Sequence, residues 1–193
     1  MTVSVSMNGK SYEGLTSDGM ATHIAGAIQL MRRGIGTRND CKLVVAHILR
    51  QYQNRLIADA LEVPYTPDAR QAEADGDEIE LEHAIPVGCI MNVLFHHAAG
   101  DTLQELAAQV TTLLENNTIL AYVTPEEHAK LNKQLQSSMP DGFDTYPWRD
   151  VWARYAFAGV PVPEGASSPE CLEDFIARRG SSHLTCAEPG AGN

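Results

Sequence analysis

Hydrophobic and acidic residues alternate strictly at residues 78–84, EIELEHA. In a strand this alternation directs Ile79, Leu81 and His83 to one face and the glutamates to the other, so it predicts a strand with His83 turned toward the core. A second run rich in β-branched and aromatic residues, TILAYV at 118–123, predicts another strand. A histidine on a core face is either a hydrogen-bonded structural residue or a functional group, and the pattern leaves both readings open.

Helical spacing of hydrophobic residues dominates the rest of the chain. It predicts helices at about 18–33, 39–62, 86–100, 101–115, 125–136, 148–157 and 170–179. The clearest helix start is TPEE at 124–127, where an N-cap threonine is followed by a proline at the first helical position and by a glutamate that completes a capping box. Prolines, acids and Gly76 predict an exposed loop at 63–77. Weaker patterns predict a short strand or hairpin at 1–15 and a flexible tail at 181–193.

These elements predict an α+β fold, a mostly helical single domain with a small antiparallel β-hairpin packed on a helix. The hairpin pairs residues 78–84 with 118–123, and the helix is the one at 125–136. The chain then divides into four parts: a helical N-terminal part (1–77), a core (78–136) with a helical insertion at 86–115, a C-terminal helical part (137–180) and a tail (181–193).

The composition is that of a globular protein with an ordinary hydrophobic core. A chain of 193 residues that is 44% hydrophobic is long enough to fold without a disulfide or metal staple. Its four cysteines are widely separated and form no Cys-x-x-Cys pair, which predicts neither a zinc knuckle nor a disulfide framework. We find neither the pattern of a signal peptide nor the ~20 apolar residues that cross a bilayer. The sequence predicts a cytoplasmic protein without a membrane partner.

Charge is distributed unevenly along the chain. The net charge is −11, yet residues 1–60 carry seven Lys and Arg against four Asp and Glu. The segment 32–55 is basic, and its first cations are Arg32, Arg33, Arg38 and Lys42. It is either a solvated helical surface or a patch that contacts the phosphates of nucleic acid.

Two histidines are predicted to face inward. His83 ends the first strand, and His128 shares a helical stripe with Leu131 and Leu135. Between them, the asparagine pair at 116–117 precedes the second strand. The two histidines are either structural or part of a metal and base site. We find no phosphate-binding glycine loop and no Gly-x-Ser-x-Gly motif, which argues against nucleotide hydrolases and acyl transferases.

The ordered set of motifs resembles the ββα-metal finger of HNH (His-Me finger) nucleases. The run LEHAIP at 81–86 is similar to the acid-His-x-Ile-Pro opening of that family, Asn117 precedes the second strand, and His128 lies early on the following helix. The resemblance covers about residues 78–135. It implies a ββα-metal-like core that hydrolyses phosphodiester bonds in nucleic acid.

The resemblance also implies a role for each matching residue. His83 would be the general base that activates water. Glu82 and His128 would hold one divalent cation, Mg²⁺ or a transition ion. Asn117, with Asn116 as the competing choice, would fix the loop or orient His83 by hydrogen bonding.

Two functions are therefore open. The first is an HNH-like metal-dependent nuclease whose partner is nucleic acid, approached by the basic segment 32–55. The alternative is a non-catalytic acidic binding or inhibitor protein on a degenerate HNH-like scaffold, of a phage or plasmid accessory type and possibly a nucleic-acid mimic. Its partner would be a basic nucleic-acid-binding protein. The sequence gives neither the oligomeric state nor a choice between DNA and RNA.

Overall fold

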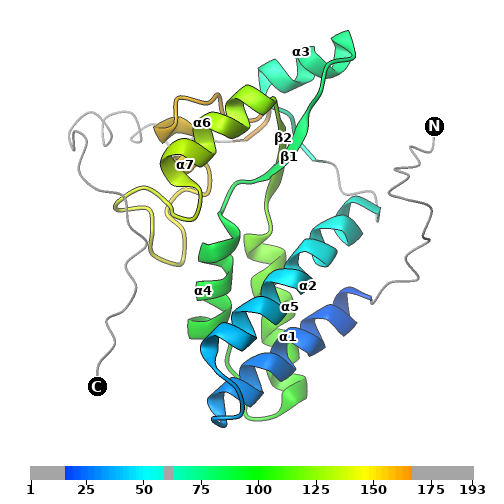
Figure 1. Ribbon diagram of the computed structural model, residues 1–193, viewed down its shortest axis with the longest axis vertical. Coiled ribbons are helices and arrows are strands. Elements are labelled where there is room, and N and C mark those ends of the chain that lie inside the picture. The colour runs from blue at the N-terminus through cyan, green and yellow to red at the C-terminus, as the bar shows by residue number, and fades with distance from the viewer. Residues whose placement is uncertain (1–15, 59–62, 167–193) are drawn as a thin grey trace.

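The computed structural model describes residues 16–58 and 63–166 (Figure 1). The predicted strand at 1–15, the helix at 170–179 and the tail at 181–193 lie outside the described residues. Within them, seven helices and a two-stranded antiparallel sheet form one mostly helical α+β domain, which confirms the predicted fold class. None of the helices in these two ranges is long and apolar enough to cross a membrane.

The elements separate into a helical bundle and a smaller end that carries the sheet (Figure 1). Helices α1, α2, α4 and α5 form the bundle, and the strands lead from it to α3, α6 and α7. In chain order the elements are α1 (Ser17–Arg32), α2 (Arg38–Ala58), α3 (Pro67–Asp75), β1 (Glu80–His83), α4 (Val87–His97), α5 (Leu103–Asn117), β2 (Leu120–Val123), α6 (Pro125–Leu135) and α7 (Ala153–Phe157).

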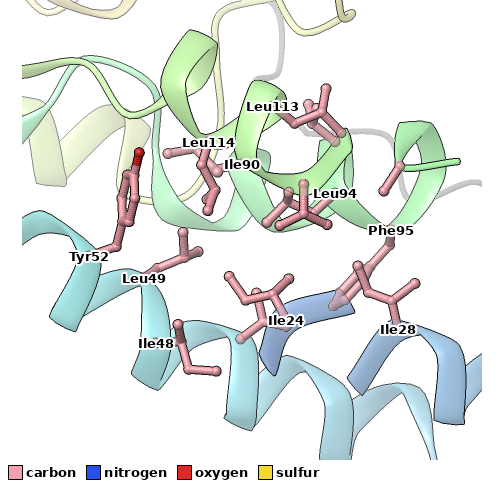
Figure 2. Close-up of a cluster of buried hydrophobic side chains, with 14 of the residues drawn as sticks. Ile24, Ile28, Ile48, Leu49, Tyr52, Ile90, Leu94, Phe95, Leu113 and Leu114 are labelled. Carbon is pink, nitrogen blue, oxygen red and sulfur yellow. The ribbon is translucent and has the colours of Figure 1, made fainter. Parts of the chain in front are cut away.

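The main core lies between the four helices of the bundle. Each helix contributes one apolar stripe, for example Ile24 from α1, Leu49 from α2, Leu94 from α4 and Leu114 from α5 (Figure 2). Burial of these side chains is the main force that holds the bundle together. Helices α4 and α5 are the insertion predicted between the two strands, so the insertion supplies two of the four bundle helices.

The two strands pair in the predicted antiparallel sense. Glu80 lies opposite Val123 and His83 opposite Leu120. On the other edge of β2, Tyr122 donates its N–H to the carbonyl of Pro64 and accepts from the N–H of Thr66. Helix α6 packs against β1, which confirms the predicted packing of the hairpin on this helix.

A second, smaller hydrophobic cluster fills the space between the sheet, α6 and α7. Its largest members are Val123 from β2, Leu131 from α6, and Trp152 and Tyr155 from the C-terminal segment. The rings of Trp152 and Tyr155 meet edge to face, with centroids 5.2 Å apart. This cluster fixes the segment that contains α7 over one face of the sheet.

The prediction of a loop over residues 63–77 is wrong, because this region contains α3. The Thr66 side chain caps the helix by accepting from the N–H of Ala69, and Pro67 occupies the first helical position. Gly76 ends the helix with φ at 80°, a conformation that favours glycine. The prolines and acids of this stretch were interpreted as loop residues, although a Thr-Pro pair starts helices here and at Thr124.

Helix α7 is shorter than the predicted helix at 148–157. The buried Asp150 accepts a hydrogen bond from the N–H of Trp152, 2.9 Å away. A side chain that bonds to a nearby backbone group in this way competes with helical hydrogen bonds. The regular helix therefore begins only at Ala153.

Two helices start with the same capping box in different surroundings. Thr102 and Glu105 form it at the exposed start of α5, and Thr124 and Glu127 form it at the start of α6. Glu127 is 2% exposed. Its Oε2 accepts from the Thr124 N–H at 2.8 Å and from the Thr66 hydroxyl at 2.7 Å, so this box joins α6 to the start of α3.

We expect Glu127→Ala to lower the free energy of unfolding by about 2 to 3 kcal/mol, because it leaves the buried Thr66 hydroxyl and a helix N–H without their acceptor. Glu105→Ala removes the same box from an exposed helix and serves as the matched control, with a smaller loss. Urea denaturation followed by circular dichroism measures both. Equal losses would show that the contact with Thr66 contributes nothing.

Candidate functional site

The candidate site lies on the face of β1 that α6 and α7 cover. Glu80 and Glu82 share this face, where the cross-strand neighbours of the two glutamates, Val123 and Ala121, are fully buried. The alternation predicted that the His83 face of this strand turns toward the core, and the structure also largely buries Glu82 on the opposite face. The Glu82 side chain is only 13% exposed, because α6 and α7 bring His128 and Arg154 against it.

His128 lies between the two glutamates. Its Nδ1 contacts Glu80 Oε2, and its Nε2 is 3.7 Å from Glu82 Oε2. The first turn of α6 holds it there, on a helix anchored by the fully buried Leu131 and Leu135. The structure therefore brings Glu82 and His128 together, the two residues that the resemblance to HNH nucleases would give to a metal ion.

Arg154 supplies a positive charge to the site. Its side chain is 1% exposed, and one nitrogen of its guanidinium donates to Glu82 Oε1 at 2.5 Å and to the carbonyl of His83 at 2.9 Å. The other terminal nitrogen lies 3.4 Å from Asn132 Oδ1 on α6. Arg154 thus ties α7 to β1 and α6 at once. An arginine keeps its charge when it is buried, so Glu82 has a permanent counter-charge.

Arg154 is a site residue that was not predicted from the sequence. The hydrophobic residues around it could have revealed it, because Arg154 lies in the run VWARYAF at 151–157, which the hydrophobic pattern assigns to the core. Arginine is almost never fully buried unless an acid pairs with it. That rule predicts a buried carboxylate near Arg154 but does not name it.

The charges around Glu82 do not fit a metal ion. The Arg154 guanidinium already binds this carboxylate, and a second cation at the same group would be repelled. Among the described residues, no group of three or more His, Cys, Asp or Glu side chains is arranged to hold a metal. The arrangement is instead a hydrogen-bonded ion network that holds helices to a strand.

His83 belongs to the opposite face of β1. Successive residues of a strand alternate between faces, and Glu80 and Glu82 occupy the face with His128. Burial lowers the pKa of His83 from its usual 6.5, and the nearby Arg154 lowers it further, while Glu82 raises it. The imidazole is therefore neutral at pH 7. It lies on the opposite face of β1 from Glu82 and His128, beside which it would have to activate water as a base.

Asn117 is fully buried at the end of α5. Its amide nitrogen donates to the carbonyl of Leu113 at 2.6 Å, and its oxygen accepts from the Trp148 indole. It holds the segment before α7 against the bundle. The competing residue, Asn116, is exposed on the outer side of the same helix.

Two of the four predicted nucleic-acid contacts are exposed, but their guanidinium groups contact residues at the end of α4. Arg32 donates to the carbonyl of Ala98 at 2.6 Å, and Arg38 lies 5.7 Å from the Phe95 ring centroid and 3.2 Å from His96 Nε2. They attach α1 and α2 to the end of α4. The other two predicted contacts, Arg33 and Lys42, are exposed and half-buried respectively.

No family model, curated protein or solved structure matches the chain. The resemblance to HNH nucleases therefore rests on the runs at 81–86 and 117–128 alone.

We expect Arg154→Met to lower the free energy of unfolding by about 3 to 5 kcal/mol, because it leaves the Glu82 carboxylate in a largely buried position without its counter-charge. Urea denaturation measures the loss. The matched control is the exposed pair of Lys130 and Glu126, 3.1 Å apart within α6, where Lys130→Met should change stability by less than about 0.5 kcal/mol. A similar small effect for both variants would contradict the assigned role of Arg154.

The lowered pKa of His83 predicts how stability depends on pH. The unfolded chain binds a proton at this histidine near its usual pKa of 6.5, and the folded protein does so only at lower pH. Stability should therefore be intact above pH 6.5 and fall as the pH drops below it. We expect the loss in urea midpoint between pH 7.5 and 5.5 to be smaller in His83→Gln than in the original chain. His96, whose pKa is also lowered, is present in both proteins and cancels in the comparison.

Proposed function

We propose that the protein is a non-catalytic acidic binding protein, whose partner is a basic nucleic-acid-binding protein. The observation that carries the proposal is the bond between Arg154 and Glu82. In this bond, the Glu82 carboxylate is part of a structural ion pair. The nuclease interpretation needs the same carboxylate as a metal ligand. The alternation of β1 then separates Glu82 from the side chain of His83, the base that this interpretation also needs.

The exposed acids supply the binding surface. Residues 67–82, from α3 through β1, contain seven Asp and Glu against one Arg. We call this segment the acidic end. Five of its acids, Asp68, Glu73, Asp75, Asp77 and Glu78, are exposed. Helix α3 of the acidic end lies at the opposite end of the molecule from the turn between α1 and α2 (Figure 1), and the sequence has Arg32, Arg33 and Arg38 at that turn.

The local structure keeps this surface rigid. Helix α3 is capped at both ends, and Tyr65 packs against Tyr122 of β2 with ring centroids 4.6 Å apart. The Tyr65 hydroxyl donates to Glu73 at 2.7 Å, and burial together with this carboxylate raises the tyrosine pKa to about 12. A fixed array of negative charge attracts a basic surface from a distance and speeds its association.

The test compares binding and cleavage in the full-length protein. We expect the immobilised protein to capture basic nucleic-acid-binding proteins from a cell extract, identified by mass spectrometry and released by excess duplex DNA. The triple variant Asp75→Asn, Asp77→Asn, Glu78→Gln should capture at least tenfold less, because the partner loses the charges that it recognises. A matched triple variant of exposed bundle acids, Asp18→Asn, Asp101→Asn, Glu115→Gln, should capture normally.

A plasmid-nicking assay with Mg²⁺, Mn²⁺ or EDTA completes the test. We expect no metal-dependent cleavage. Cleavage that disappears in His83→Gln would support the nuclease instead, and equal capture by the two triple variants would rule out the acidic end as the binding surface.

A further inference from the structure

An apolar groove is open to solvent on the bundle, on the side of α1 and α2. It is lined by His23 of α1 and by Leu43, Val44, His47 and Ile48 of α2, and its volume is about 430 Å³. Leu43 is 73% exposed and Val44 45% exposed. Their side chains contribute little to the core, since α2 already buries Val45, Ile48 and Leu49 on its inner side.

Further apolar exposure continues this surface toward the turn between the helices. Leu30 is 48% exposed near the end of α1, and Ile35 is 60% exposed in the turn. Single exposed hydrophobic residues are common on proteins, but several on one helical hairpin are typical of an interaction site. We call the face formed by these residues and the groove the hairpin face.

Gly26 follows the groove residue His23 by three residues, slightly less than one turn of α1. It lies in the middle of α1, where glycine destabilises a helix relative to alanine. A Cβ atom added to Gly26 would meet nothing within 4 Å. No contact inside the described protein therefore requires a glycine here, whereas close packing of another helix on α1 would.

One acid and one base on the α2 part of the hairpin face allow a second copy of the chain to pair with it. From residue 19 to residue 31, α1 contains no Asp, Glu, Lys or Arg. On α2, the exposed Asp40 and Arg50 lie on either side of the apolar pair Leu43 and Val44. If two α2 helices cross antiparallel near residues 44–47, Asp40 of each copy lies beside Arg50 of the other.

We propose that the hairpin face is the interface of a symmetric dimer of this chain, in which α1 and α2 of two copies form a four-helix contact. A two-fold interface joins the same patch on both copies, which the balanced pair of Asp40 and Arg50 allows. The dimer also leaves α3 of each acidic end outside the interface, because α3 lies beyond the far end of the bundle (Figure 1). The guanidinium groups of Arg32 and Arg38 contact Ala98 and His96 at the end of α4 rather than the residues of the groove.

This inference does not depend on the proposed partner of the acidic end. A dimer would present two acidic ends to that partner, and it could form whether or not the acidic end binds anything. The experiment on capture and the experiment on association can therefore fail separately.

Sedimentation velocity of the full-length chain over a concentration series tests the proposal. We expect a species of twice the 21.0 kDa chain mass at micromolar concentration. Leu43→Glu should raise the dissociation constant at least tenfold, because each interface gains two buried carboxylates. It should leave the monomer folded, since residue 43 is exposed and both residues favour helix. Leu103→Glu, at an exposed leucine outside the hairpin face, is the matched control and should dimerise normally.

Gly26→Ala distinguishes a dimer interface on α1 from a helix surface that is exposed to solvent. Alanine should stabilise the α1 helix, so within the monomeric Leu43→Glu protein it should raise the melting temperature. In the original chain it should raise the dissociation constant about tenfold, because the added methyl groups hold the two α1 helices apart. A monomeric original chain, or a dimer that Leu43→Glu and Gly26→Ala leave unchanged, would overturn the proposal.

Discussion

The ion pair between Arg154 and Glu82 is the contact on which the smaller end of the protein depends. It lies where β1, α6 and α7 meet, and the same guanidinium also binds the carbonyl of His83 and the amide of Asn132. Hydrophobic contacts alone are sparse there, because the second cluster consists largely of alanine and valine with two aromatic rings. A charged group held by three partners gives this end one defined arrangement, which packing of small side chains would not specify.

Much of the fold is visible in the sequence because its signals are local. The start of α6 was predicted from four residues, and the strands from alternation and composition. Helix α3 was missed although Thr66 and Pro67 carry the same start signal as Thr124 and Pro125, because the acids around them outweighed it. The shortening of α7 depends on one side-chain bond of Asp150, which periodicity does not report.

The site was harder to predict because its geometry comes from contacts between distant residues. Glu82 and His128 were named from their order along the chain, and they do lie near each other. Their order did not reveal Arg154, which lies 72 residues beyond Glu82. The Arg154 guanidinium is the counter-charge of the Glu82 carboxylate. The same applies to Asn117, whose indole partner comes from a segment 31 residues away. Side-chain partners of this kind follow from the packing of elements rather than from any local pattern.

The insertion of α4 and α5 between the two strands affects how the protein assembles. The strands can pair only after the chain between them has turned back, and an unstructured loop of that length would carry a large closure entropy. Because α4 and α5 pack against each other and against α1 and α2, they bring the ends of that loop together. Formation of the sheet is thus coupled to formation of the bundle. Thermal opening of the bundle should therefore release the strands as well, so that the two hydrophobic clusters unfold as one cooperative unit.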